Sequence, residues 1–111
     1  MNNDTLAFQR LDIYKAAKEL ARLVHQGRIR DAELRDQATR ASKSTFLGLC
    51  EGLPSDAPGI RRRHFDIANN SLHEVVGAID LAETIGALDT DVAQAILALA
   101  VRVKRMIRAL R

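Results

Sequence analysis

Apolar residues recur along this chain at the three- and four-residue spacing of amphipathic helices. The pattern predicts four helices, over about residues 8–26, 31–51, 60–85 and 90–110. In each segment the apolar positions fall on one face when successive residues are placed 100° apart, and charged residues lie opposite. Period-two alternation, which would indicate β-strands, never extends beyond a few residues. The predicted fold class is therefore all-α.

Each predicted helix supplies one apolar stripe to a common core. The expected core positions are Ile13, Ala17, Leu20, Ala21 and Val24; Leu34, Ala38, Ala41, Thr45 and Leu49; Phe65, Ala68, Leu72, Val75, Val76, Ile79 and Ala82; and Val92, Ile96, Leu99, Val103, Met106, Ile107 and Leu110.

Glycine, proline and aspartate mark where these helices start and stop. Both prolines and two glycines fall within residues 52–59, which predicts a loop there. Gly27 and Gly86 each follow an apolar segment, where a left-handed residue often ends a helix. Asp31 and the run 89–91 are candidate N-terminal caps. Short connections force neighbouring helices to run antiparallel, so we predict an up-down-up-down four-helix bundle.

The composition is that of an ordinary globular protein. The chain has 111 residues, 47% apolar and 28% charged, which suits a single domain over residues 1–111 and excludes a disordered chain. Its longest apolar run, residues 95–101, is far shorter than the roughly 18–20 residues of a membrane-spanning helix, so no membrane partner is expected. A polar N-terminal segment and a single cysteine, Cys50, favour the cytoplasm.

The last predicted helix carries more apolar surface than a bundle core requires. Leu97 and Val101 lie outside its core stripe, and Ala93 and Ala98 flank them. Monomers seldom leave such a patch open, so we predict that these four residues contact another copy of the chain. The alternative is a wide core stripe with a few exposed apolar residues. In the third segment Ile67, Leu81 and Ile85 lie at the margin of the apolar face in the same way.

Basic residues are concentrated near the end of the chain. The chain has 17 Lys and Arg against 14 Asp and Glu, and from residue 92 onward it contains no acid. Three interpretations are open: these residues complement the negative end of the helix dipole, bind the phosphates of RNA or DNA, or pair with an acidic surface of a neighbouring subunit. The candidate nucleic-acid-binding residues are Arg61, Arg62, Arg63, Arg102, Lys104, Arg105 and Arg108.

The sequence contains no recognisable catalytic motif. His25, His64 and His73 are too scattered to place two metal ligands on one turn of a helix. Cys50 has no neighbouring base, and a buried, inert thiol is its favoured interpretation. No phosphate-binding loop or zinc motif occurs. We therefore expect a non-enzymatic protein with no catalytic residue, no metal and no cofactor.

Polar residues on the second and third helices predict a structural network. Arg40, Ser44 and Glu51 project from one side of the second helix, and Ser71 and Glu74 lie at the edge of the apolar face of the third. An unpaired charge inside a bundle is costly, so we predict that Arg40 pairs with a carboxylate. The alternative is that these residues lie at the stripe margins and meet water.

Within this network, Glu51 occupies an unfavourable position. It lies at the C-terminal end of its helix, where the dipole disfavours a negative charge. We therefore expect Glu51 to accept hydrogen bonds from Arg40, Ser71 or backbone N–H groups at the start of the third helix. Loss of this acceptor in Glu51→Ala is predicted to cost roughly 1–3 kcal/mol.

The same residues carry a resemblance to a known family. The motif reads Arg40-Ala41-x-x-Ser44, Leu49-Cys50-Glu51-Gly52, Phe65-x-x-Ala68-x-x-Ser71-Leu72-x-Glu74 and Ile85-Gly86-x-Leu88. With it, and over about residues 8–110, the chain resembles the bacterial four-helix bundle proteins, also called intervening-sequence proteins because some are encoded within inserts in large-subunit ribosomal RNA genes. The resemblance implies a left-handed up-and-down bundle, no known enzymatic activity and a ring of five subunits.

A related branch, the accessory variability proteins of diversity-generating retroelements, is similar to a basic barrel that binds nucleic acid and a reverse transcriptase. Those relatives are more strongly basic than this chain, whose formal net charge is +3. The resemblance thus implies a family member of unassigned role, a homo-oligomeric binding or scaffold module. The alternative is a nucleic-acid-binding accessory protein that uses the basic surface of the last helix.

Overall fold

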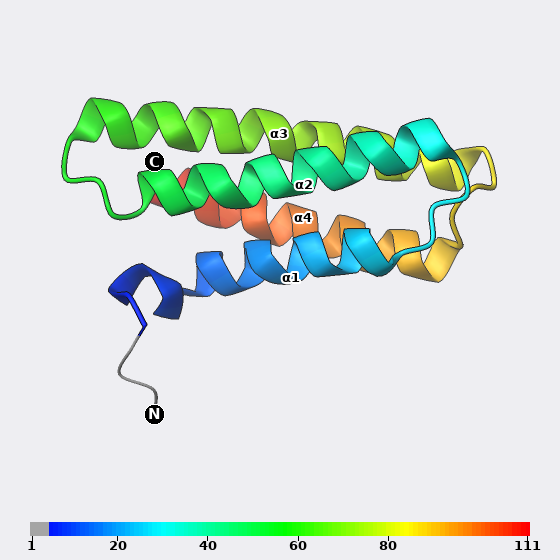
Figure 1. Ribbon diagram of the computed structural model, residues 1–111, viewed down its shortest axis with the longest axis horizontal. Helices are drawn as coiled ribbons and strands as arrows, with labels where there is room; N and C mark the ends of the chain where they lie inside the picture. The colour runs from blue at the N-terminus through cyan, green and yellow to red at the C-terminus, as the bar shows by residue number, and fades with distance from the viewer. Residues whose placement is uncertain (1–4) are drawn as a thin grey trace.

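The computed structural model describes residues 5–111; the first four residues of the polar N-terminal segment lie outside this range. One short 3₁₀ helix precedes four α-helices (Figure 1): η1 covers Ala7–Arg10, α1 Asp12–Gln26, α2 Ala32–Gly52, α3 Pro58–Thr84 and α4 Thr90–Leu110. Residues 5–111 form no strand, and the predicted all-α class and four helices are confirmed.

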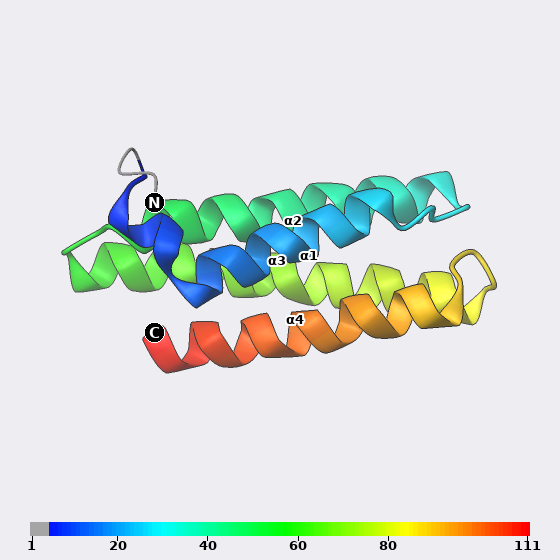
Figure 2. The same cartoon turned by 90° about the horizontal axis from the view of Figure 1, so that it is seen from below.

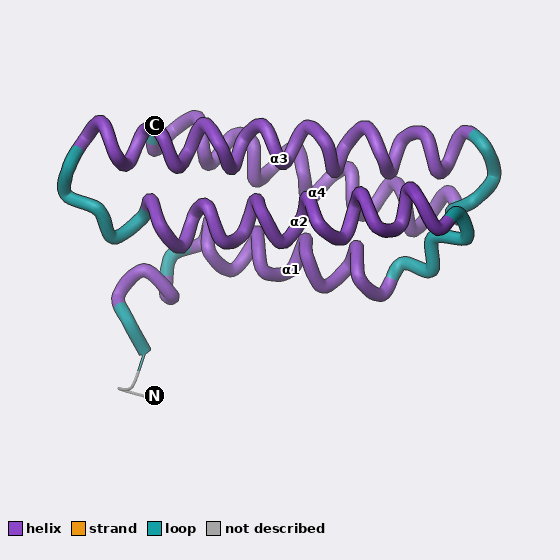
Figure 3. The backbone as a smooth tube through the Cα atoms, turned by 45° about the horizontal axis from the view of Figure 1, so that its top comes forward, coloured by secondary structure: helices purple, strands orange, loops and turns teal. Residues whose placement is uncertain are grey.

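Consecutive helices run antiparallel, and α4 returns to pack against α1 (Figures 1 and 3). In this order α1 lies diagonally across the bundle from α3, and α2 diagonally across from α4 (Figure 2). The two short turns meet at one end of the bundle. There the backbone N–H of Arg30 donates to the carbonyl of Ala87 at 2.8 Å, and the Arg30 guanidinium donates to the carbonyl of Gly86 at 3.0 Å.

Helix starts follow local chemistry. Asp31 caps α2 as predicted, because its carboxylate accepts a hydrogen bond from the backbone N–H of Leu34 at 2.9 Å. The expected start at residue 8 is wrong for α1: Leu11 has an extended backbone (φ −73°, ψ 143°), which separates η1 from the helix. α3 begins with Pro58, slightly before the expected residue 60, since proline is pre-organised for the first helical position.

The left-handed residues after α1 and α3 differ from each other. Gly86 has φ +76° as expected, so an L side chain there would be strained. Gly27 does not have the left-handed backbone expected of it, because its φ is −73°. The residue with a positive φ, 55°, is Arg28. The helix end was therefore predicted at the right place, but the residue that turns the chain was not.

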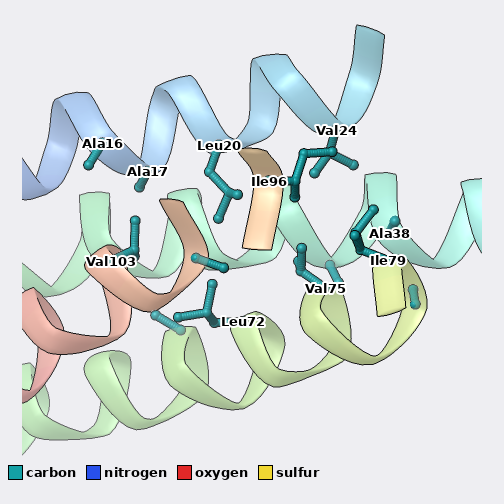
Figure 4. Close-up of a cluster of buried hydrophobic side chains, with 14 of the residues drawn as sticks. Ala16, Ala17, Leu20, Val24, Ala38, Leu72, Val75, Ile79, Ile96 and Val103 are labelled. Atoms are coloured by element: carbon teal, nitrogen blue, oxygen red, sulfur yellow. The ribbon is translucent and has the colours of Figure 1, made fainter. Parts of the chain in front are cut away.

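The apolar faces of α1, α2, α3 and α4 meet in one core. Figure 4 shows Leu20, Ala38, Leu72, Ile79 and Ile96 converging from the four helices. Most predicted core positions are buried. The exceptions lie at stripe margins: Ala21, Leu34, Val76, Val92, Leu99 and Met106 are half-buried, and Leu110 is exposed.

The core stripe of α4 differs from the predicted one and includes two alanines. The buried residues of this helix are Ala93, Ile96, Ala100, Val103 and Ile107, which are separated alternately by three and four residues. This is the spacing of a helix that packs against its neighbours along a narrow buried stripe. Ala93 is fully buried inside the subunit, so its predicted place on the outer side is wrong.

Small side chains let α2 and α3 pack more extensively than any other helix pair. A Cβ on Gly48 would lie 3.2 Å from the Cβ of Ala68, and a Cβ on Gly52 would lie 2.9 Å from the ring of Phe65. The Phe65 side chain is fully buried and has no room to move away. Glycine at position 52 is therefore a packing requirement.

We predict that Gly52→Ala lowers the free energy of unfolding by about 1–3 kcal/mol, the usual cost of overpacking a filled core. Gly77→Ala is the matched control. Gly77 lies inside α3, and a Cβ added there would have no atom within 4 Å, so alanine should stabilise the helix by about 0.5–1 kcal/mol. Urea unfolding at one fixed subunit concentration measures both changes. A Gly52→Ala protein that is as stable as Gly77→Ala would contradict the packing argument.

Candidate interaction surfaces

Two of the four residues predicted to contact another copy are exposed on α4. Val101 has 46% of its surface exposed, and Ala98 is exposed beside it. Leu97 is half-buried and packs against the core, and Ala93 lies within the core. The predicted subunit contact on this helix is therefore reduced to a smaller surface, and the contact itself stays a prediction.

Two of the predicted basic residues make contacts within the subunit. Arg61 donates to the carbonyl of Leu53 at 2.8 Å, and its guanidinium lies 5.0 Å from the centre of the Phe65 ring. The Lys104 ammonium lies 2.6 Å from the Nε2 atom of His73, which ties α4 to α3. These contacts hold Arg61 half-buried against the protein, whereas Lys104 stays exposed.

The other predicted basic residues are exposed, and within residues 5–111 they make no hydrogen bond or ion pair: Arg62, Arg63, Arg102, Arg105 and Arg108. The last three lie on the same side of α4 as Ala98 and Val101, given the 100° rotation per residue. We call these five side chains the α4 outer face: Ala98, Val101, Arg102, Arg105 and Arg108. It carries three positive charges and no acid.

Arg111 makes a further contact between α4 and α3. Its guanidinium donates to the carboxylate of Asp66, and this hydrogen bond, helped by the charge of Arg111, lowers the pKa of Asp66 from its ordinary value. A carboxyl group whose pKa is lowered on folding stabilises the fold above its unfolded pKa, and loses that contribution as the pH falls through the lowered value. The contact is at the surface, so its effect on stability is small.

The predicted polar network exists in part. The hydroxyls of Ser44 and Ser71 lie 2.8 Å apart between α2 and α3, as the sequence suggested. Arg40 is exposed and, within residues 5–111, does not reach a carboxylate directly: it donates to Gln37 at 3.1 Å, and Gln37 donates to Glu74 at 3.2 Å. The predicted ion pair is therefore wrong, because the amide of Gln37 lies between the two charges. Gln37 was missed since a lone glutamine carries no distinctive sequence pattern.

Glu51 has a partner on α3, but not the expected one. Its carboxylate lies 3.3 Å from the Nδ1 atom of His64, with 63% of the Glu51 side chain exposed. Arg40, Ser71 and the backbone at the start of α3 do not donate to it. Because exposed pairs contribute about 0–1 kcal/mol, the expected cost of Glu51→Ala falls below about 1 kcal/mol.

A row of exposed large apolar side chains follows the border between α2 and α3. Ile60, Ile67 and Leu81 are spaced by multiples of seven along α3, and Ile85 lies one turn further, so the four share one side of this helix. Glu74, at the intervening position, reaches Gln37 of α2, which identifies the side as the one next to α2. Leu47 of α2 lines the same open groove as Ile67.

We call these five residues the apolar seam: Leu47, Ile60, Ile67, Leu81 and Ile85. Their exposed fractions lie between 44% and 55%. The sequence had indicated the three members at the margin of the third segment. It missed Leu47 and Ile60, because a single apolar residue on a polar face or at a helix start is not a pattern.

Within residues 5–111 no three His, Cys, Asp or Glu side chains lie close enough together to hold a metal ion. None of the helices in that range has the length and apolar character needed to cross a membrane.

Comparison with known proteins identifies the family. A model of the 23S rRNA-intervening sequence protein family matches residues 9–109 of the chain. The chain belongs to this family. The resemblance carried by the sequence motif is thereby confirmed, and no curated protein matches the chain significantly.

In this member of the 23S rRNA-intervening sequence protein family, several motif residues lie at the contact between α2 and α3. Ser44 bonds Ser71, and Gly52 makes room for Phe65. Ala68 lies under Gly48 in the same contact. These five motif residues, Ser44, Gly52, Phe65, Ala68 and Ser71, therefore lie where α2 and α3 pack together.

Cys50, also within the motif, is half-buried rather than fully buried. Burial raises the pKa of its thiol above the ordinary value, and the negative charge of Glu51 raises it further. Because the thiolate is the reactive form, a raised pKa slows its reaction with electrophiles. The inert thiol expected from the sequence is supported in this respect, although part of the side chain meets solvent.

We predict that Glu51→Gln increases the alkylation rate of Cys50 at pH 8, because removal of the adjacent charge lowers the thiol pKa. The rate should remain below that of cysteine in an unfolded peptide, since burial, the larger cause, is unchanged. Glu33→Gln, a carboxylate at the other end of α2, is the control and should leave the rate as it is. Mass-spectrometric time courses measure this, and equal rates in all three proteins would remove the proposed influence of Glu51.

Proposed function

We propose that this chain is a non-enzymatic, homo-oligomeric binding or scaffold module of the cytoplasm, and that its subunits form a ring of five. The observation that carries the proposal is the apolar seam, where five large aliphatic side chains are each about half exposed. A monomer seldom leaves so many large apolar side chains open to water along one helix border. Burial against another copy would remove it.

The number five comes from the resemblance to the bacterial four-helix bundle proteins. A ring with an odd number of subunits needs a heterologous contact, in which two different surfaces of each copy meet. The chain carries two candidate surfaces, the apolar seam and the α4 outer face.

The proposed cytoplasmic location rests on cysteine usage. Cys50 is the one cysteine of the chain and cannot form a disulfide within it, which agrees with a reducing compartment.

We predict that the purified protein at micromolar concentration has a mass of five times the 12.3 kDa subunit, measured by light scattering after size-exclusion chromatography. Dilution should lower the mass, because association follows mass action. A protein that stays monomeric throughout the micromolar range would overturn the proposal, and an oligomer of another size would overturn the number five.

A second candidate function, nucleic-acid binding, rests on the α4 outer face. Arg102, Arg105 and Arg108 are exposed and free of ion pairs in the described part of the chain, and Arg62 and Arg63 add to the basic surface. Phosphate contacts supply most non-specific affinity for nucleic acid. In an assembly that leaves these residues exposed, several copies of one weak basic surface would act together, which raises the overall affinity.

We predict for this second function that binding to RNA or DNA weakens steeply as salt rises from about 50 to 200 mM. A variant with both Arg102→Gln and Arg105→Gln should bind more weakly and with a shallower salt dependence, because each lost phosphate contact removes counterion release. Lys15→Gln, an exposed charge on α1, is the control. Fluorescence anisotropy gives these slopes; no binding at the lowest salt would exclude the function.

A further inference from the structure

The apolar seam and the α4 outer face lie on different sides of the bundle. α2 and α4 lie diagonally across the bundle from each other. Figures 1 and 2, which view the bundle from directions 90° apart, agree on this arrangement. The α4 outer face points away from the core and hence away from α2. One copy can therefore present both surfaces at once, each to a different neighbour.

One half of the apolar seam is acidic. The hydrogen bond between Ser44 and Ser71 sets the antiparallel register of α2 and α3, and the equal rise of the two helices then brings Glu33 beside Leu81. Glu74 lies one heptad before Leu81 on the same side of α3. From His64 to Ile85, moreover, the sequence of α3 contains no Lys or Arg. Two arginines also lie here: Arg30, which reaches the carbonyl of Gly86, is paired with Asp89, and Arg40 contacts Glu74 only through Gln37. On the α3 side, the surround of Leu81 and Ile85 is therefore acidic.

The α4 outer face has the opposite character. Its three arginines make no ion pair within residues 5–111, and the sequence from Val92 onward contains no acid. Asp91, one heptad before Ala98, lies on the same side at the start of α4. Its apolar residues, Ala98 and Val101, are smaller than the leucine and isoleucine of the seam. Small residues on one helix give the large side chains of another helix room to insert, which is how knobs and holes pack.

We propose that the acidic half of the apolar seam, around Leu81 and Ile85, binds the α4 outer face of a second copy of this chain. This inference rests on the proposed homo-oligomeric function and assigns its two contacting surfaces. Leu81 and Ile85 lose their contact with water against Ala98 and Val101, while the α4 arginines meet Glu33 and Glu74. Complementary charge of this kind orients the two surfaces. It also disfavours contact between two acidic surfaces or between two basic surfaces.

The contact is heterologous, because the seam of one copy meets the α4 outer face of the next. An open row of copies keeps one unused seam at one end and one unused α4 outer face at the other, so the arrangement gives a ring where the rotation closes. A contact between two seams would instead give a two-fold dimer and leave the α4 arginines uncovered. The two arrangements respond differently to single-surface variants.

The experiment uses one variant for each surface. Leu81→Lys places a positive charge where the α4 arginines should lie, and Val101→Glu places a negative charge where the acidic half of the seam should lie. Both side chains are about half exposed, so the fold should persist, which helicity and the thermal midpoint check. Leu11→Lys is the matched control, since Leu11 is 44% exposed and belongs to neither surface.

Each variant alone should dissociate to monomers, with a dissociation constant raised at least tenfold, while Leu11→Lys assembles as the parent does. An equal mixture of the two variants should associate again, in complexes with equal amounts of both chains, because each supplies the surface that the other lacks. Native mass spectrometry of isotope-labelled and unlabelled chains measures this composition.

Assembly of Val101→Glu alone, with Leu81→Lys monomeric and no mixed complex, would overturn the heterologous contact in favour of seam against seam. Assembly of both variants as in the parent would overturn the assignment of surfaces and leave the proposed function standing. A monomeric parent protein would overturn both.

Discussion

α2 and α3 approach each other so closely that a methyl group at Gly52 would lie 2.9 Å from the ring of Phe65. Between the same two helices Gly48 faces Ala68, and Ser44 bonds Ser71. A contact made of small side chains has no space for large ones, so the large apolar residues beside it stay outside. The packing that closes this helix pair therefore also leaves the apolar seam exposed.

α4 repeats this relation on the other side of the bundle. It places Ala93 and Ala100 in the core, and the larger Val101 lies outside. A stripe that includes small residues lets the neighbouring helices approach α4 at those positions. At the turn end, the guanidinium and backbone of Arg30 bond to the segment between α3 and α4, which fixes the two halves of the bundle together. The buried stripe of α4 and the outward position of Val101 thus follow from the same helical rotation.

The helical periodicity alone was enough to predict the class, the four helices and most of the core, because burial of one apolar face per helix requires it. It failed at Ala93, since alanine is only weakly apolar and a pattern of larger residues one position away outweighed it. The links through Gln37 and His64 were not predictable either, because they depend on which side chains the helix register brings together. Of the apolar seam, the sequence indicated only Ile67, Leu81 and Ile85, because these residues border the apolar face predicted for the third helix.

The α4 arginines are the residues on which the two candidate functions compete. In the proposed head-to-tail assembly Arg102, Arg105 and Arg108 lie at a subunit contact, and a phosphate backbone cannot reach them there without displacing a neighbour. Arg62 and Arg63, at the start of α3, are not part of either contacting surface. Nucleic acid and a neighbouring subunit would therefore compete for the α4 outer face. A ligand shifts an equilibrium toward the state that it binds better. Nucleic acid bound to these three arginines would thus favour the dissociated chain.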